Sequence, residues 1–241
     1  MMKSEGAPQI GFDRFIQLDW ARAALRVRAG FSDPEDLAQL IDETHSGAAA
    51  KKKTRTVLNR LWLEPRLELA ELSDRAVAIY VVDPGVSVAA LTWGMAIATY
   101  PFFGSVAQIV GRLIRLQGDC TSAEVHRRMA ETYGEREGTR RMTNMVLQSQ
   151  ADWGAIERLN KGKNINARRE PITLTPDLEV WLVEAALSHA GRAMSISSVT
   201  TNPVLFPFSF SDRVAYNLSK NERFSVRVDS SGNRVVDLLG K

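Results

Sequence analysis

Cysteine and histidine are scarce in this chain. Its 241 residues include one cysteine, Cys120, and three histidines, His45, His126 and His189. A single cysteine cannot form an intrachain disulfide or a CxxC redox pair, and scattered histidines do not supply the clustered ligands of a zinc site. We therefore expect no disulfide framework, no metal site and no cofactor.

Motifs of the common enzyme classes are also missing. The sequence contains no GxGxxG or GxxxxGK phosphate loop, no GxSxG nucleophile elbow and no HExxH metal pair. We expect Cys120 to be a buried, inert thiol and His126 to be a solvated side chain on a helix surface. Asp74 and Arg75 are expected to be ordinary surface charges. The sequence therefore predicts a protein without enzymatic activity.

Charge is absent from one long segment. Between Asp83 and Arg112 the chain reads PGVSVAALTWGMAIATYPFFGSVAQIVG, which is long enough to cross a bilayer. Polar residues and glycines dilute this segment, Pro101 divides it, and no basic cluster marks one flank. We predict two buried core helices that meet at Tyr100 and Pro101, and no membrane span. Because the initial residues MMKSEGAPQIGFDRF lack the apolar run of a signal peptide, we expect a cytoplasmic protein.

The first hundred residues carry helical patterns and no strand-like alternation. Helices are indicated over residues 11–30, 32–43, 51–63 and 67–82. Ser32 and Glu35 have the spacing of a capping box, with Pro34 in the first turn of that helix. Asp83-Pro84-Gly85 is a strong signal for the end of the fourth helix. Residues 1–100 are therefore predicted to form an N-terminal helical domain.

Residues 101–190 begin with three helical patterns. The first, PFFGSVAQIVGRLIRLQG, ends at Gly118, and the second runs from a capping box formed by Thr121 and Glu124 to Gly134. The third, EGTRRMTNMVLQSQADWG, spaces its apolar residues at helical intervals. Its apolar face holds Met142, Met145, Val146 and Trp153, and its opposite face holds Arg140, Arg141, Asn144 and Gln148.

A hairpin is predicted after the third helix. Residues 155–159 are typical of a short strand, NKGKN turns the chain through Gly162, and INARREPITL can return as a second strand. Thr175 and Pro176 then cap another helix, DLEVWLVEAALSHAG. Three helices, a hairpin and a capping helix in this order are the plan of a winged helix-turn-helix, in which the hairpin is the wing. We predict this fold for residues 101–190.

Residues 191–241 are predicted to form a C-terminal extension that contains β structure. The segment RFSVRVDSSGNRVVDLL is typical of a hairpin, with Val226 and Val228 expected to face Val235 and Leu238 across the four-residue turn Ser230-Ser231-Gly232-Asn233. The chain as a whole is thus predicted to be mainly α with a small β component. Its N-terminal helical bundle is followed by the winged helix-turn-helix and by this short β-containing tail.

Positive charge is concentrated around the predicted winged helix. The chain has 31 Lys and Arg against 28 Asp and Glu, whereas residues 127–169 hold ten basic residues against five acidic ones. In a winged helix, the third helix enters the major groove of DNA and the wing contacts phosphates or the adjacent minor groove. Arg can pair with guanine, and Asn or Gln with adenine. The sequence therefore predicts that the partner is double-stranded DNA.

The predicted contacts divide into two groups. The groove-facing side chains are expected to be Arg140, Arg141, Asn144 and Gln148. The side chains that grip the backbone are expected to be Lys161, Lys163, Arg168 and Arg169. A possible second basic patch contains Lys51, Lys52, Lys53 and Arg55, and it fits a solvated helix start as well as it fits a phosphate contact. Glu135 and Glu137, at the start of the third helix, would oppose DNA binding by repelling phosphate.

Two other functions fit the same pattern. Many winged helices mediate contacts between proteins, so the basic face could instead meet an acidic partner as an adaptor. A transcriptional regulator is the third possibility, and regulators usually bind two-fold related half-sites as dimers. The sequence has no heptad run that would form a coiled-coil dimer, and it leaves the oligomeric state open.

The order of these elements resembles one protein family. A helical half with a KTRTVLNRLW helix is followed by an uncharged helix pair ending in YPFF, then by the helix-turn-helix and a late LTPDLEVWL. This layout, over most of residues 10–185, resembles the BrxA-type accessory proteins of bacteriophage-exclusion (BREX) defence systems, with a longer C-terminus. The resemblance implies a small, non-enzymatic DNA-binding component of a multi-protein antiphage system, which would act with other defence proteins. It implies no catalytic residues.

Overall fold

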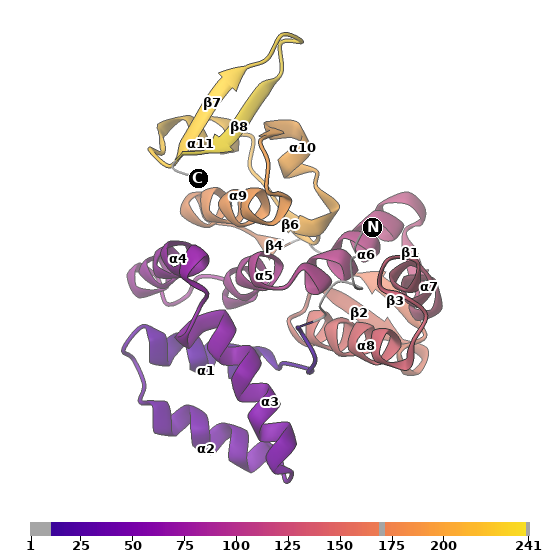
Figure 1. The fold of residues 1–241 in the computed structure, drawn as a ribbon. Helices are drawn as coiled ribbons and strands as arrows, with labels where there is room; N and C mark the ends of the chain where they lie inside the picture. Colours follow the sequence, from indigo (N-terminus) through magenta and orange to yellow (C-terminus); the bar gives the residue numbers. More distant parts are fainter. Residues whose placement is uncertain (1–10, 169–171, 240–241) are drawn as a thin grey trace, which may run out of the picture.

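The computed structural model describes residues 11–168 and 172–239. Helices dominate it, and its strands form small sheets (Figure 1). The predicted fold class, mainly α with a small β component, is confirmed. The predicted contact residue Arg169 lies outside the described residues.

The N-terminal part is helical, as predicted. Its elements are α1 (Leu18–Arg28), α2 (Pro34–Thr44), α3 (Ala48–Leu58), a π-helical turn (Asn59–Leu63), a 3-10 turn (Leu67–Leu69) and α4 (Ala70–Val82). The predicted cap of α2 is wrong by one residue. Asp33, not Ser32, caps this helix and pairs with Asp36. The reason is that Pro34 takes the first helical position, which leaves the residue directly before it as the cap.

The segment before α1 is not helical, in contrast to the prediction. Phe12 and Ile16 are fully buried although the chain there is irregular. The Ile16 N–H donates to Ser149 Oγ at 2.9 Å, and the Ile16 carbonyl accepts from Trp153 Nε1 at 2.9 Å. These tertiary bonds to a distant helix replace the bonds that a helical turn would make, so α1 begins only at Leu18.

Two central helices meet at the predicted break. They are α5 (Val88–Thr99) and α6 (Pro101–Gln117), and ten of the twelve residues of α5 are buried. Among the described residues, no single helix is long and apolar enough to cross a membrane. The pair of α5 and α6 passes that test only when taken together, and the pair is bent by 118°.

A helix–strand–helix–helix–hairpin order follows. After α6 the elements are β1 (Asp119–Thr121), α7 (Ser122–Tyr133), α8 (Glu137–Asp152), β2 (Ile156–Leu159), a tight turn (Asn160–Gly162) and β3 (Asn164–Ala167). The capping box of Thr121 and Glu124 at α7 is confirmed, and so is the hairpin of β2 and β3. Strand β1, which no sequence pattern indicates, pairs antiparallel with β3, so the sheet order is β1-β3-β2.

The C-terminal part packs on α5 through α9 (Pro176–Ala190), a helix that was expected to cap the winged helix and instead joins this part (Figure 1). Its other elements are β4 (Ile172–Thr173), β5 (Met194–Ser195), α10 (Ile196–Thr200), a 3-10 turn (Pro203–Leu205), β6 (Phe208–Ser209), α11 (Val214–Lys220), β7 (Phe224–Val228) and β8 (Arg234–Leu238). The second strand of the wing is predicted to span residues 165–174. In the structure β3 ends at Ala167, and β4 pairs in parallel with β6 instead of extending the hairpin.

The terminal hairpin is confirmed, but its predicted register is wrong. Val226 faces Val236, and Val228 faces Arg234. The turn includes Asp229, whose carboxylate accepts hydrogen bonds from the N–H groups of Ser231 and Asn233, both at 2.9 Å. This capped loop is one residue longer than expected, and a one-residue change moves side chains to the opposite face.

An aromatic cluster joins the three parts of the chain. Ring centroids lie 5.2 Å apart for Phe12 and Phe103, 5.2 Å for Trp93 and Phe103, and 5.3 Å for Phe103 and Trp153. Phe208 packs edge-on against Trp93 at 5.7 Å. The predicted domain boundaries at residues 100 and 190 stay predictions, and these contacts cross both of them.

A buried carboxylate links α4 to α9. Glu184 is 4% exposed and accepts hydrogen bonds from Arg75 Nε at 3.0 Å and from Arg223 Nη2 at 3.2 Å. The expectation that Arg75 is an ordinary surface charge is therefore wrong, because α9 places an acid against it. Asp74 is exposed and forms an ion pair with Arg28 at 2.6 Å.

Candidate nucleic-acid interface

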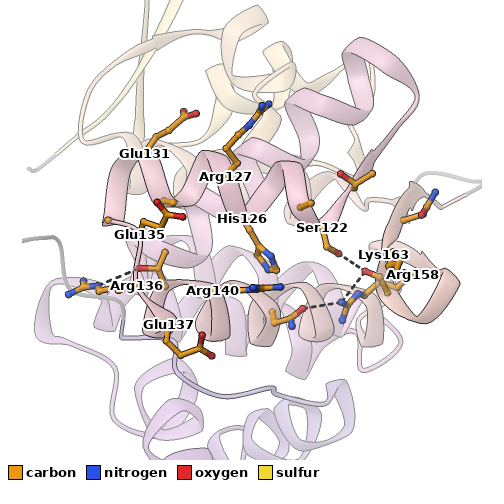
Figure 2. Close-up of a pocket in the computed structure, with 18 of the residues that line it drawn as sticks. Ser122, His126, Arg127, Glu131, Glu135, Arg136, Glu137, Arg140, Arg158 and Lys163 are labelled. Carbon is orange, nitrogen blue, oxygen red and sulfur yellow. Dashed lines mark hydrogen bonds between the residues drawn. The ribbon is translucent and has the colours of Figure 1, made fainter.

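A hollow of about 1240 Å³ lies between α7, α8 and the turn that joins β2 to β3. We call it the α7–α8 hollow (Figure 2). Its lining carries six cationic side chains, which are Arg127, Arg136, Arg140, Arg158, Lys161 and Lys163. It also carries three acidic ones, Glu131, Glu135 and Glu137. The hollow therefore has an excess of positive charge.

Acidic side chains gather at one end of the hollow, with Arg136 among them, and the opposite end is basic. Figure 2 shows Glu131, Glu135 and Glu137 together where α7 gives way to α8. At the opposite end, Arg158 and Lys163 come from the β2–β3 hairpin. An anion in the hollow would thus be repelled at the α7–α8 connection and attracted at the hairpin end.

The hairpin turn is fastened to the start of α7. The Ser122 N–H donates to the Lys163 carbonyl at 2.8 Å, and Ser122 Oγ donates to the Gly162 carbonyl. The backbone of Asn160, Lys161 and Gly162 has φ values of 51°, 56° and 82°. These bonds hold a turn of unusual backbone conformation in place, so the lysines that flank Gly162 start from a defined position.

Arg158, on strand β2 of the hairpin, also stabilises this turn through hydrogen bonds. Its Nη2 donates to Asn144 Oδ1 at 3.0 Å and to the Gly162 carbonyl at 3.3 Å. Its Nε is buried and, within the described residues, has no hydrogen-bond partner. Burial lowers the pKa of this guanidinium, because a charged group loses hydration there. A partly desolvated cation therefore faces the hollow.

Gly162 is expected to be required at this turn. A Cβ at Gly162 would lie 2.6 Å from Nη2 of Arg158 and would force that side chain to move. Gly232, in the terminal hairpin, has nearly the same φ of 81° and no atom within 4 Å of such a Cβ. Alanine at either position incurs about 1–2 kcal/mol of left-handed strain. We expect Gly162→Ala to lose about 1 kcal/mol more, from displaced hydrogen bonds. Thermal unfolding of both variants measures this, and equal losses would contradict it.

His126 lies in the hollow rather than on a solvated surface. It projects from α7 toward Arg140 of α8 (Figure 2). Its Nε2 is buried and has no hydrogen-bond partner within the part of the chain that the structure describes. Burial, then Arg140 and Arg158, lower the pKa of His126. The prediction of a solvated histidine is thus wrong, because α7 packs on α8 and half-buries the side chain.

The structure brings together part of the predicted groove-facing set. Arg140, Arg141 and Gln148 are exposed along α8, and Arg140 also lines the hollow. Asn144 lines it as well, but its carboxamide oxygen already accepts a hydrogen bond from Arg158. Asn144 therefore holds Arg158, and that oxygen is only partly available to a base.

The predicted backbone-gripping residues are divided. Lys161 and Lys163 are exposed and line the hollow. Arg168 is not in its lining, because Arg168 Nη1 donates to the Gly154 carbonyl at 3.1 Å. The sequence pattern does not indicate Ser122, His126 or Arg158 as site residues. For Arg158, however, a sequence signal exists. This residue follows the apolar Ile156 by two residues on the predicted strand, and residues two apart on a strand share a face.

The possible second basic patch is largely neutralised by carboxylates. Lys51 Nζ and Arg55 Nη2 lie 3.2 and 3.1 Å from Asp42 Oδ1, and Lys53 Nζ lies 2.9 Å from Asp13 Oδ2. By contrast, none of the six cations of the hollow forms an ion pair with a carboxylate in residues 11–168 and 172–239. Unlike the possible second basic patch, the hollow therefore keeps its positive charge available to a partner.

Comparisons with protein-family models, with curated proteins and with solved structures found no match to this chain. The geometry and charge of the hollow are therefore the observations that bear on function. Cys120 is buried, and burial, with Glu124 and Asp119 nearby, raises the pKa of its thiol to about 12. Within the described residues, no cluster of acidic, histidine or cysteine side chains could hold a metal ion.

Proposed function

We propose that α6–α8 and β1–β3 form a winged helix-turn-helix that binds double-stranded DNA. The helix–strand–helix–helix–hairpin order and the sheet order β1-β3-β2 support this assignment. In such a domain α8 is the recognition helix and the β2–β3 turn is the tip of the wing. The fastening of that turn to α7 and α8 suits a wing that keeps one position while it contacts DNA.

The unpaired cations of the α7–α8 hollow are the observation that carries the proposal. Arg140 and Arg141 are exposed on α8, and Lys161 and Lys163 are exposed at the wing. Cations without carboxylate partners can neutralise phosphates and release condensed counterions without first losing an internal ion pair. Gln148, one turn beyond Asn144 on α8 and exposed, has the amide geometry that suits an adenine edge.

The acidic end of the hollow restricts how DNA approaches. Glu131, Glu135 and Glu137 would repel phosphates where α7 gives way to α8. The proposed path therefore brings the DNA backbone past the wing end, where Arg158, Lys161 and Lys163 lie. This arrangement gives the contact a direction, which a uniformly basic surface would not do.

The salt dependence of binding tests the proposal. We expect wild-type protein to bind a labelled random 30-mer duplex in fluorescence anisotropy. About four phosphate contacts predict that affinity falls about 100-fold between 50 and 200 mM salt. Absence of binding at 50 mM salt would reject the DNA-binding role and favour the competing adaptor role, in which the basic face meets an acidic protein.

A place in phage defence extends the proposal. Its support is the resemblance to BrxA-type accessory proteins of BREX systems, in which this chain would act with other defence proteins. The transcriptional-regulator alternative predicts a dimer that protects two half-sites one helical turn apart. Footprinting on genomic fragments, with the mass of the complex measured by light scattering, separates the two roles.

A further inference from the structure

We infer that His126, Arg140 and Arg158 form a niche that binds one phosphate group inside the α7–α8 hollow. The inference rests on the proposed function and adds to Arg140 two side chains, His126 and Arg158, that the sequence pattern does not assign to contact. The phosphate can belong to the DNA backbone or to a free phosphorylated molecule. The chemistry of the niche is the same for both sources.

The geometry of three elements supports the niche. His126 comes from α7, Arg140 from α8 and Arg158 from β2, and all three line the same hollow. His126 Nε2 and Arg158 Nε are both buried without a hydrogen-bond partner in the described part of the chain. A buried donor or acceptor without a partner destabilises the protein, so a bound group that hydrogen-bonds to both atoms would be stabilised there.

A phosphate suits three converging side chains because it offers an oxygen to each of them, whereas a carboxylate has only two oxygens. Guanidinium groups match the spacing of phosphate oxygens and bind them through two parallel hydrogen bonds. Arg158 is already oriented by Asn144 and by the Gly162 carbonyl. Arg140 is exposed and forms no ion pair among the described residues, so it can turn toward an arriving anion.

Phosphate binding in this niche is coupled to proton uptake by His126. Charged groups face the hollow from every element packed around it. Helix α7 and its end contribute Arg127, Glu131 and Glu135, and α8 and its start contribute Arg136, Glu137 and Arg140. Strand β2 contributes Arg158, and the hairpin turn contributes Lys161 and Lys163. In the free protein, burial, Arg140 and Arg158 hold the pKa of His126 below its ordinary value of 6.5. A phosphate that neutralises the two arginines removes their repulsion, so the pKa rises.

The niche is expected to bind phosphate more tightly at lower pH. The bound state holds a proton on His126 at a pH where the free state does not, so affinity strengthens as the pH falls. The dependence is confined to the window between the lowered pKa of the free ring and the higher pKa of the bound ring. Within that window, a single coupled proton strengthens binding by up to about tenfold per pH unit.

Ring signals of the three histidines provide the first test. We would follow the NMR titration of His126 in full-length protein alone, with a 20-bp duplex, and with inorganic phosphate, using His45 and His189 as internal references. If the duplex raises the pKa of His126 and inorganic phosphate does not, the niche is assigned to a DNA backbone phosphate. A rise with inorganic phosphate alone, with competition against duplex, assigns it to a free phosphorylated molecule. If neither ligand raises the pKa of His126, the niche is overturned.

Duplex affinity as a function of pH provides the second test. Between pH 5.5 and 8, wild type is expected to bind more tightly as the pH falls, and His126→Gln is expected to flatten that dependence. His45→Gln, a control on a ring that contacts Thr54 at 3.1 Å, should keep the wild-type slope. If His126→Gln keeps the wild-type slope, the niche is wrong while DNA binding stands. If wild type binds no duplex, the proposed function fails, and the phosphate titration still decides the niche.

Discussion

Arg140→Glu with Arg141→Glu is expected to weaken duplex binding about 100-fold at 100 mM salt, through two lost phosphate contacts and two added repulsive charges. Lys161→Glu with Lys163→Glu should have a similar effect. Both pairs are exposed and form no ion pairs within the described residues, so reversal should leave folding intact. Each pair should also reduce the slope of log affinity against log salt by about 1.8. Anisotropy titrations at four salt concentrations measure both quantities.

A control with the same change in net charge separates contact from bulk charge. Arg192 and Arg213 are exposed, belong to the C-terminal part and do not line the α7–α8 hollow. Reversal of both to Glu changes the net charge by the same amount as either test pair. We expect this control to bind within about threefold of wild type at 100 mM salt, since charges beyond a Debye length of about 10 Å are largely screened. Equal weakening in all three double variants would show a diffuse charge effect and no specific face.

Glu184→Ala is expected to be the most destabilising single substitution proposed here. It removes a 4% exposed carboxylate that accepts hydrogen bonds from Arg75 and Arg223. Breaking a buried ion pair costs about 3–5 kcal/mol, because the remaining charge is left uncompensated. We expect about 3 kcal/mol, since the side chains of Arg75 and Arg223 keep 31% and 37% of their surface exposed. That loss lowers the melting temperature by about 6–12 °C in a chain of this size.

Glu71→Ala is the matched control for Glu184→Ala. Glu71 contacts the same two arginines, at 3.4 Å from Arg75 and 2.8 Å from Arg223, but its side chain is 73% exposed. Hydrogen bonds from Arg223 and Arg75 lower the pKa of Glu71 below 4.5. Its stabilising effect is therefore complete above pH 4.5 and is lost only as the pH falls through the lowered pKa. At pH 7 the loss should be far smaller than for Glu184→Ala, and equal losses would contradict the role of burial.

Elements with strong local signals were predictable from the sequence. The capping box at Thr121 places the start of α7, and Pro101 places the break between α5 and α6. Gly162 marks the turn of the β2–β3 hairpin. Each of these features depends on residues within a few positions of one another, so local conformational preference is enough to specify it.

Elements that depend on distant partners were missed or misplaced. Strand β1 has three residues, and only its pairing with β3, more than forty residues later, makes it a strand. The segment around Ile16 remains non-helical because Ser149 and Trp153 take its hydrogen bonds. Arg75 becomes part of a buried network only because α9 brings Glu184 against it. A local sequence pattern carries little information about such contacts. Several local conformations are similar in energy, and tertiary contacts decide which of them forms.

The candidate site also combines features that the linear sequence specifies with features that only tertiary packing specifies. Composition and spacing alone place an excess of basic residues around α7, α8 and the hairpin, because charge and helical periodicity are properties of the linear chain. Which of those charges stay available was decided by tertiary packing. Asp42 and Asp13 pair with three of the four cations of the possible second patch. By contrast, His126 and Arg158 line the hollow and have no carboxylate partner among the described residues. Ion pairing and burial depend on distances of a few ångströms between residues far apart in sequence, and only the folded chain sets those distances.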